Sequence, residues 1–239
     1  RSLLKANKTV VTGALSASIA HELNQPLGAS NINIQFLKSK LDKGQLNPEL
    51  GKEVLDDLER DNKRAATIVR SLRSIFIESD IKTEDVKVGQ IIDSVLEIVN
   101  SDLIAKNIQV NLNVDQNLRV HIKDAEFQQV LLNLINNAVQ SISSLEGLKG
   151  HIQIEATQNE EKAQISISDN GSGVPKEQQL GLFELLNTTK ETGMGLGLWL
   201  CKHIITRYEG SIYYKDAVGR GAKFVIELPL FNKNKMSHS

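Results

Sequence analysis

The chain has 239 residues, more than one ordinary domain of about 100–150 residues needs, so there is room for two domains. Hydrophobic residues make up 40% and charged residues 24%, a composition that excludes a disordered chain. The net charge of −1 provides no basic field for nucleic acid or an anionic membrane, and the single cysteine excludes an intrachain disulfide or a zinc site built from several thiolates.

No apolar run reaches the roughly 18 residues that a membrane-spanning helix needs, and no signal peptide is recognisable. We therefore expect neither a nucleic acid partner nor direct membrane contact by this segment. The sequence starts with Arg1 and not with Met, so we expect it to be a piece of a longer protein.

Two long segments with a seven-residue repeat open the chain. From about Leu3 to Leu41, apolar or small residues recur on two adjacent lines, which is typical of a helical bundle. These are Ala20, Leu27, Ile34 and Leu41 on one line and Leu23, Ser30 and Leu37 on the other. A second such segment, from about Pro48 to Ile77, follows a turn with Gly44 and Asn47 as caps. One hairpin cannot bury both lines, so we predict a homodimeric four-helix bundle for residues 1–78.

One histidine lies on the flank of this predicted bundle. His21 follows the seam residue Ala20 by one position, about 100° of helix rotation, and should therefore be reachable from solvent. Pro26 lacks the N–H that would bond to the carbonyl of Glu22, so we expect the helix to bend or loosen there. Alone, such a histidine is more often an ordinary surface or core residue than a catalytic one.

The rest of the chain has the pattern of a mixed domain. The polar stretch 79–84 is predicted to be a hinge, residues 85–232 a second domain, and residues 233–239 a disordered tail. Alternating patterns predict strands and longer apolar periods predict helices. The predicted strands are Val86–Val88, Ile108–Val114, Leu118–Ile122, His151–Thr157, Ala163–Ser168, Gly210–Lys215 and Lys223–Leu228, and the predicted helices are Gly89–Ala105, Asp124–Ile142 and Gly195–Tyr208. Strands and helices do not alternate regularly, so we predict an α+β sandwich with helices on one face of a mixed sheet.

Two polar segments of this domain suit a nucleotide. Asn133 and Asn137 lie four residues apart on one helix face, where amide oxygens can ligate Mg²⁺ beside phosphate oxygens. Asp169 follows a strand and can accept a hydrogen bond from an exocyclic amine such as that of adenine, while Gly171 and Gly173 permit close approach of a ligand. Alone, the asparagine pair is more often two exposed polar residues, and the Asp169 segment is equally compatible with a simple glycine-rich turn.

A third segment suits phosphate. Gly193-Met194-Gly195-Leu196-Gly197 leads into an apolar helix, so its bare N–H groups can hold an anion. It is neither a Walker loop, since no Gly-Lys-Ser/Thr follows, nor a Rossmann fingerprint, since no strand runs directly into it. Lys190, preceded by Thr188 and Thr189, can reach a terminal phosphate as a point charge.

Together, these segments resemble the sequence boxes of the sensor histidine kinases of two-component systems. The resemblance covers roughly residues 8–230, with all five boxes in the family's order. They are the H box at His21–Pro26, the N box at Asn133–Ala138, the G1 box at Asp169–Gly173, the F box at Phe183–Lys190 and the G2 box at Gly193–Leu198. The motifs are most similar to the subgroup that contains the oxygen-sensing and dicarboxylate-sensing kinases.

The resemblance implies a fold and a reaction. Residues 1–78 would be the dimerisation and histidine-phosphotransfer domain, and residues 85–232 the catalytic ATP-binding domain with the Bergerat-type fold. His21 would be phosphorylated from Mg-ATP, Glu22 would hold the second ring nitrogen, and the phosphoryl group would pass to an aspartate of a response-regulator receiver domain. The chain would be cytoplasmic, by itself or as the cytoplasmic part of a membrane-anchored sensor.

The resemblance also implies roles within the nucleotide site. Asn137, with Asn133 beside it, would ligate Mg²⁺, Asp169 would recognise adenine, and Gly171 and Gly173 would hinge a lid at about 174–192. The residues around the triphosphate would be Gly193, Gly195, Leu196 and Gly197, with Thr188, Thr189 and Lys190 near its end.

Three positions depart from the family's pattern, and two rival functions use similar residues. Gln25 replaces the Thr or Asn that positions water for dephosphorylation of the regulator, Ala222 replaces a hydroxyl near the adenine, and Gln140 replaces a lysine. An ATP-hydrolysing dimeric switch of the gyrase and chaperone class would carry a glutamate base where Asn133 stands. A nucleotide-gated scaffold without phosphotransfer is the second alternative.

Overall fold

The computed structural model describes residues 2–76, 83–145, 147–159, 162–184, 195–217 and 219–230. The chain divides into two compact units, Arg1–Glu78 and Ser79–Ser239. Only the backbone is described for residues 2–19, 21–22, 64, 67 and 70–76. The predicted tail 233–239 and most of the predicted hinge lie outside the described residues, and Glu84 is already the first residue of a strand.

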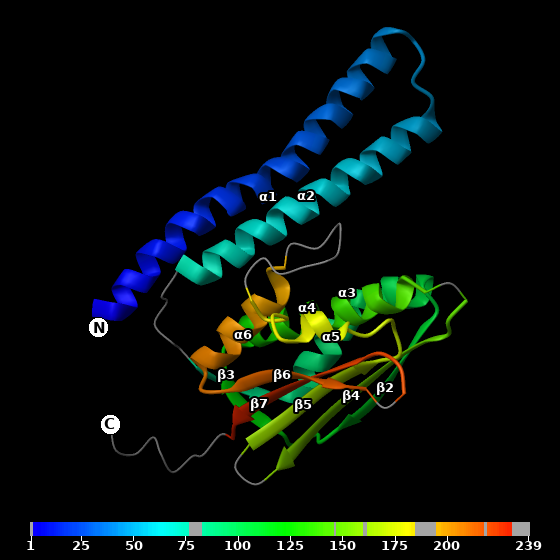
Figure 1. Ribbon diagram of the computed structural model, residues 1–239. Helices are drawn as coiled ribbons and strands as arrows, with labels where there is room; N and C mark the ends of the chain where they lie inside the picture. Colours follow the sequence, from blue (N-terminus) through cyan, green and yellow to red (C-terminus); the bar gives the residue numbers. More distant parts are fainter. Residues whose placement is uncertain are drawn as a thin grey trace. The chain divides into compact units, whose positions relative to one another are not determined.

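The first unit is a helical hairpin (Figure 1). It consists of α1 (Ser2–Asp42) and α2 (Pro48–Phe76), as the seven-residue repeats predict. Between them Gly44 has a φ of +63°, and the Asn47 side chain accepts the N–H of Leu50 at 2.8 Å, so both predicted caps are present. Helix α1 continues through Pro26, which is buried.

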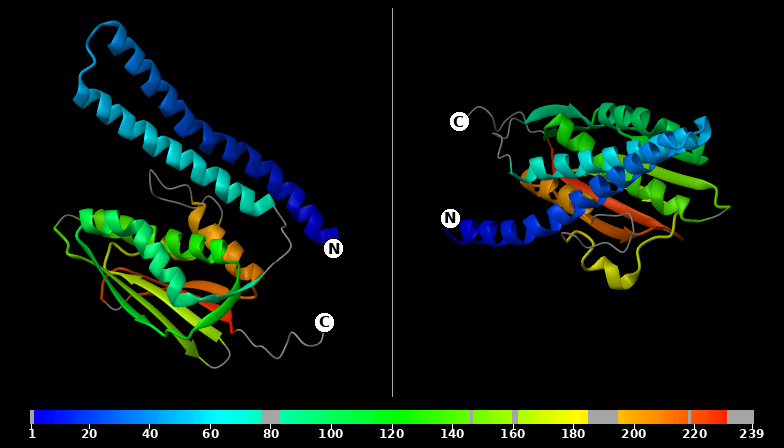
Figure 2. Two further views of the ribbon diagram at one scale, coloured as in Figure 1. Left: turned by 180° about the vertical axis from the view of Figure 1, so that it is seen from behind. Right: turned by 90° about the horizontal axis from the view of Figure 1, so that it is seen from above.

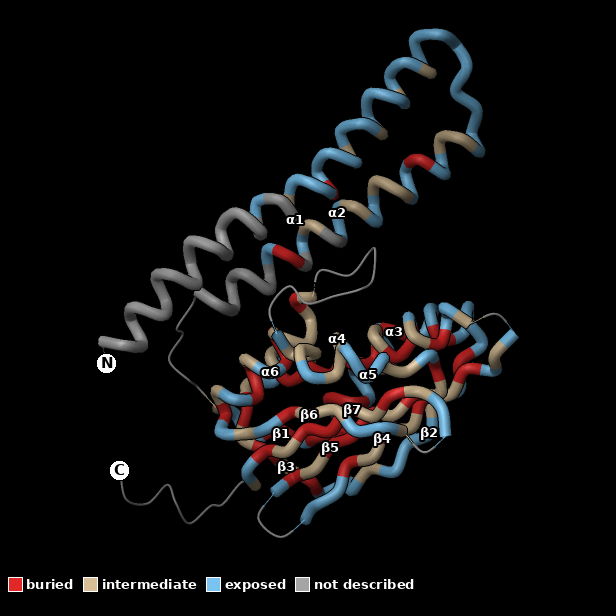
Figure 3. The backbone as a smooth tube through the Cα atoms, in the orientation of Figure 1, coloured by how far each residue is buried: buried red, intermediate tan, exposed pale blue. Residues whose placement is uncertain are grey.

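The two seam lines of α1 differ in burial within this single hairpin. Leu27, Ile34 and Leu41 are 56%, 43% and 65% exposed, whereas Leu23 and Leu37 are half-buried. Figure 3 shows how much of α1 and the turn is exposed. One hairpin therefore covers one line of α1 and leaves an apolar line in solvent.

The second unit is an α/β sandwich. A small sheet pairs β1 with β3 in antiparallel register, and a five-stranded sheet has the order β2-β4-β5-β7-β6, with β2 parallel to β4 and the other neighbours antiparallel. The elements are β1 (Glu84–Lys87), α3 (Val88–Ala105), β2 (Ile108–Val114), β3 (Arg119–Ile122), α4 (Asp124–Ser143), β4 (Gly150–Asn159), β5 (Lys162–Asp169), α5 (Lys176–Gln179), α6 (Gly197–Arg207), β6 (Ser211–Asp216) and β7 (Ala222–Pro229). Helices α3, α4 and α6 lie on the same face of the larger sheet (Figures 1 and 2), which confirms the predicted sandwich.

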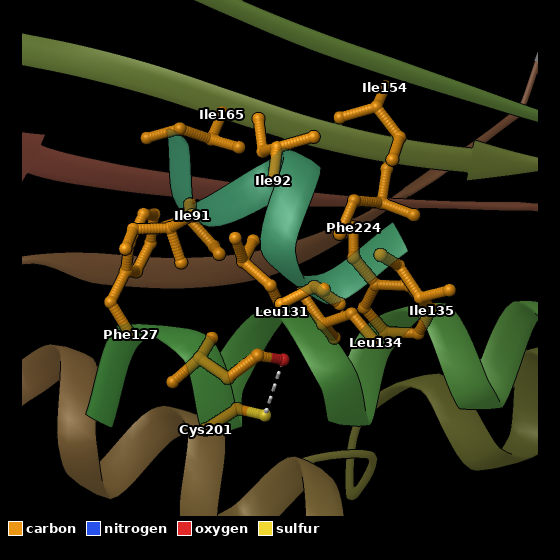
Figure 4. Close-up of a cluster of buried hydrophobic side chains, with 14 of the residues drawn as sticks. Ile91, Ile92, Phe127, Leu131, Leu134, Ile135, Ile154, Ile165, Cys201 and Phe224 are labelled. Atoms are coloured by element: carbon orange, nitrogen blue, oxygen red, sulfur yellow. Dashed lines mark hydrogen bonds between the residues drawn. The ribbon is translucent and has the colours of Figure 1, made fainter. Parts of the chain in front are cut away.

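The core lies between these helices and the sheet (Figure 4). The fully buried side chains of this unit come from α3, α4, α6 and the strands, and α4 contributes a large share. They include Ile92, Phe127, Leu131, Leu134, Ile135, Ile154 and Ile165. Because the apolar face of α4 is fixed against the sheet, its polar face must point away from the core.

Two element boundaries differ from the predictions. The predicted helix from Gly195 begins at Gly197, because Gly195 has a φ of +62° and cannot be part of a right-handed helix. Val88, predicted to end a strand, is the first residue of α3. Among the described residues, no helix is long and apolar enough to cross a membrane.

Candidate nucleotide-binding site

Asn133 joins α4 to the glycine-rich start of α6. Its amide nitrogen donates to the carbonyl oxygen of Gly197 at 3.4 Å and to Cys201 Sγ at 3.8 Å. Its amide oxygen accepts from Gln129 Nε2 at 3.1 Å. The amide predicted to lie beside Mg²⁺ is therefore held by three protein groups, and it ties two segments 64 residues apart in sequence to one place.

The start of α6 is anchored by buried side chains. The first N–H groups of a helix have no partner within the helix, and they lie at the positive end of its dipole. Leu196, immediately before α6, is buried, as are Leu200 and Ile204 further along. The start of α6 is thus held in place, and its free N–H groups suit an anion, as its glycines predict. Gly193, Thr188, Thr189 and Lys190 lie outside the described residues.

Asp169 ends β5 in a tightly packed loop. Its carboxylate is buried, and Oδ1 accepts the N–H of Gly171 at 2.8 Å. A Cβ added to Gly171 would lie 2.3 Å from Ser141 Oγ on α4, and one added to Gly173, whose φ is +74°, would lie 2.9 Å from the carbonyl oxygen of Gly221. Both glycines are needed because protein atoms approach them closely. The sequence analysis had explained them by the approach of a ligand.

Gly221 contacts the candidate site, and the sequence analysis did not single it out. A Cβ at this position would lie 1.8 Å from the carbonyl oxygen of Asp169, and its φ is +108°. The turn before β7 therefore packs directly on the backbone of the residue predicted to recognise adenine. Ala222, the neighbour singled out from the sequence, is buried at the start of β7.

The first part of the predicted lid is attached to the β6–β7 edge. The Phe183 ring of the F box meets Phe224 edge-on, with centroids 6.3 Å apart. Gln179 Nε2 donates to Asp216 Oδ1 at 3.4 Å, and the Tyr214 hydroxyl donates to the same oxygen at 2.9 Å. Burial, with Asp216 as a further cause, raises the pKa of Tyr214 to about 12.

The first turn of α4 also contacts the end of α6, far from the glycines. The Glu126 carboxylate in the first turn of α4 accepts from the Tyr208 hydroxyl at 2.7 Å and pairs with Arg207 at the end of α6. Closer to the site, complete burial raises the pKa of Cys201 to about 12, so its thiol stays protonated and serves packing.

The predicted phosphoacceptor segment lies in the first unit. The backbone of His21 and Glu22 is helical within α1, and their side chains lie outside the described residues. Gln25, one turn later, is exposed.

The described residues suit a magnesium ion that is held mainly by nucleotide phosphates. No group of three or more His, Cys, Asp or Glu side chains within them could hold a metal by itself. Mg²⁺ typically keeps few protein ligands and shares phosphate oxygens, and the Asn137 amide, half-buried on the polar face of α4, is a suitable hard oxygen donor.

Comparisons with known proteins agree with this geometry. Residues 122–232 match the sequence family described as histidine kinase-, DNA gyrase B-, and HSP90-like ATPase. The chain is 34% identical to sporulation kinase D of Bacillus subtilis over 96% of this chain and 44% of that protein. It is 28% identical to the sensor histidine kinase ZraS of Salmonella typhimurium over 98% of this chain and 49% of that protein. The chain thus spans less than half the length of either relative.

The fold has a counterpart among solved structures. The crystal structure of histidine kinase ThkA in complex with the response regulator protein TrrA matches with a TM-score of 0.75, covering 95% of this chain and 64% of that chain at 24% identity. At this identity the match concerns the fold. Residues 122–232 thus match an ATP-binding domain, and nearly the whole chain is similar to sensor histidine kinases.

Proposed function

We propose that this chain transfers the γ-phosphoryl group of Mg-ATP to His21 and then to an aspartate of a response-regulator receiver domain. The observation that carries the nucleotide part is the arrangement along α4. Asn133 contacts the start of α6, and Ser141, two turns later, contacts the Asp169 loop. The segments that we propose for phosphate and base therefore both contact α4.

The phosphoryl transfer requires a neutral imidazole as the nucleophile. A ring nitrogen of His21 would attack the γ-phosphorus, the bond to the β,γ-bridging oxygen would break, and ADP would leave. Glu22 would accept the N–H of the other ring nitrogen and stabilise the developing positive charge. Mg²⁺, ligated by Asn137 with Asn133 beside it, would neutralise charge on the phosphates.

The alternative of an ATP-hydrolysing switch is disfavoured at Asn133. An amide cannot take a proton from water, and this amide already bonds to Gln129 and Gly197. We therefore expect slow hydrolysis in the absence of phosphohistidine. Steady phosphate release without an acid-labile phosphoprotein would favour the switch instead.

We also propose that residues 1–78 form a homodimer through a four-helix bundle, joined by the hinge 79–84 to the ATP-binding domain 85–232. The support is the line of Leu27, Ile34 and Leu41, which a single hairpin leaves exposed. A second hairpin would bury this line in the manner of a bundle seam. Sedimentation showing a monomer at micromolar concentration would contradict the dimer.

The decisive test is labelling with γ-labelled ATP. The wild-type chain should become labelled with an acid-labile, base-stable phosphate, and His21→Gln should abolish labelling while ADP binding remains. Asn137→Ala and Asp169→Ala should weaken ADP binding itself, measured by calorimetry. Label retained in His21→Gln would refute the assignment of the phosphoacceptor, and unchanged ADP affinity in both other variants would refute the site.

Three narrower assignments rest on the motifs and the composition. We assign the chain to the subgroup of oxygen-sensing and dicarboxylate-sensing kinases, and we place it in the cytoplasm, where ATP and receiver domains are available. We assign Gln25 as the candidate for positioning water during dephosphorylation of the regulator. Dephosphorylation of a phosphorylated receiver domain by wild type and by Gln25→Ala tests this role, and equal rates would remove it.

A further inference from the structure

Ser141 makes more contacts with the Asp169 loop than any sequence motif indicates. It lies one turn after Asn137 on α4, and its hydroxyl oxygen accepts the N–H of Ser172 at 3.1 Å. The two hydroxyl oxygens are 3.3 Å apart. The carbonyl oxygen of Ser141 also receives the Ser172 N–H at 3.3 Å and the Ser144 hydroxyl at 2.8 Å.

The carbonyl of Ser141 can make these bonds because it lies in the last turn of α4. The final carbonyl groups of a helix have no partner within the helix. Here the N–H of Leu145 turns back to the carbonyl oxygen of Ile142 at 3.1 Å, so it is not directed at Ser141 in the usual α-helical manner. The end of α4 therefore offers both a carbonyl and a hydroxyl to the loop.

The loop in turn fixes the position of the Asp169 carboxylate. Gly171 lies against Ser141 so closely that a Cβ would approach Oγ to 2.3 Å and the carbonyl carbon to 2.6 Å. The N–H of Gly171 in turn donates to Asp169 Oδ1 at 2.8 Å. The backbone of Gly221 also packs on the Asp169 carbonyl. The position of the Asp169 carboxylate is thus fixed between the end of α4 and the turn before β7.

We propose that Ser141 is a positioning residue for base recognition, holding the Gly171–Ser172 loop so that the Asp169 carboxylate accepts the exocyclic amine of adenine. This inference rests on the proposed recognition of adenine by Asp169 and adds the group that orients it. A carboxylate has about four lone-pair sites, and the Gly171 N–H occupies one of them, so an amine can share the group. A carboxylate held in place before binding loses less conformational freedom when the base arrives.

The test compares two ligands that differ only in the amine. ADP and purine riboside 5′-diphosphate, which lacks the exocyclic amine, are titrated by calorimetry into the full chain and into Ser141→Ala. Loss of the hydroxyl should weaken ADP binding about five- to tenfold, the effect of one lost hydrogen bond, because the carbonyl contact with Ser172 remains. Binding of the amine-free ligand should change less than about twofold, since it makes no use of the carboxylate.

Two neighbouring serines provide matched controls. Ser143 donates its hydroxyl to the Val139 carbonyl at 2.7 Å inside α4, so Ser143→Ala removes a hydroxyl from the same turn without touching the loop. Ser172→Ala removes only the hydroxyl pair and keeps the backbone N–H that bonds to Ser141. Both variants should retain the wild-type preference for ADP over the amine-free ligand.

The outcomes separate this inference from the proposed function. Unchanged preference in Ser141→Ala, or equal weakening of both ligands, would overturn the positioning role while leaving nucleotide binding intact. Absence of ADP binding by the wild-type chain would overturn the proposed function and this inference with it. A selective loss for ADP in Ser141→Ala alone would support the role.

Discussion

Replacing Gly221 by alanine should displace the backbone at Asp169, although the change adds only one methyl group. That methyl would lie 1.8 Å from the Asp169 carbonyl oxygen, 2.6 Å from its carbonyl carbon and 2.9 Å from Asn170 Cα. All three are backbone atoms, which cannot turn aside as a flexible side chain would. The turn before β7 or the end of β5 must therefore shift.

The magnitude has two parts. A non-glycine residue at the φ of +108° costs about 1–3 kcal/mol in backbone strain. Relief of the overlap costs about 1–3 kcal/mol more, as for other small-to-large changes at packed positions. The sum of about 2–6 kcal/mol is a large fraction of the roughly 5–15 kcal/mol that holds a typical domain folded.

Gly219 in the same turn separates the two parts. Its φ is +93°, yet a Cβ there would meet nothing within 4 Å, so Gly219→Ala should cost only the backbone strain. The difference between the variants should be about 1–3 kcal/mol, or about 2–12 °C in the melting temperature of the second unit. Calorimetric titration should show that Gly221→Ala binds ADP at least about tenfold more weakly than wild type, which corresponds to about 1.4 kcal/mol.

The reasoning fails if the two variants unfold at the same temperature, because the overlap would then have no energetic consequence. It also fails if Gly221→Ala binds ADP as wild type does. In that case the turn before β7 would not control the position of Asp169.

Further predictions concern protonation and one buried hydrogen bond. Burial, and then the nearby Arg207 charge, lower the pKa of His203. The unfolded chain therefore binds this proton more readily than the folded chain, and the free energy of unfolding should fall as the pH drops below about 6.5. In urea titrations His203→Gln should lose less stability than wild type between pH 7 and pH 5, and equal losses would contradict this. Burial raises the pKa of all three tyrosines, that of Tyr214 to about 12. The tyrosinate absorbance of the folded chain should therefore rise only above the ordinary tyrosine pKa of about 10, and the free energy of unfolding should fall over the same pH range. A titration midpoint of the folded chain at about pH 10 would refute this. Tyr208→Phe removes the hydroxyl that donates to Glu126 at 2.7 Å and should cost about 1–3 kcal/mol in urea unfolding, whereas an unchanged midpoint would show that the bond contributes nothing.

The sequence alone was sufficient for most of the helices and strands. The seven-residue repeats of residues 1–78 predict α1 and α2, and alternation such as Ile108–Val114 predicts strands, because side-chain periodicity follows directly from backbone geometry. Asn133 and Asn137 could be placed on one face from their spacing alone. These features depend on neighbours in sequence, which a pattern can record.

The tertiary structure decided which of these groups meet and why particular residues are required. Asn133 reaches Gly197 and Ser141 reaches Ser172 only because the apolar face of α4 docks on the sheet and turns its polar face toward both loops. Gly171 was predicted to make room for a ligand and Gly221 was not singled out, yet both are required because protein atoms from distant segments approach them. No local pattern encodes such distances, because they arise from the packing of elements far apart in the chain.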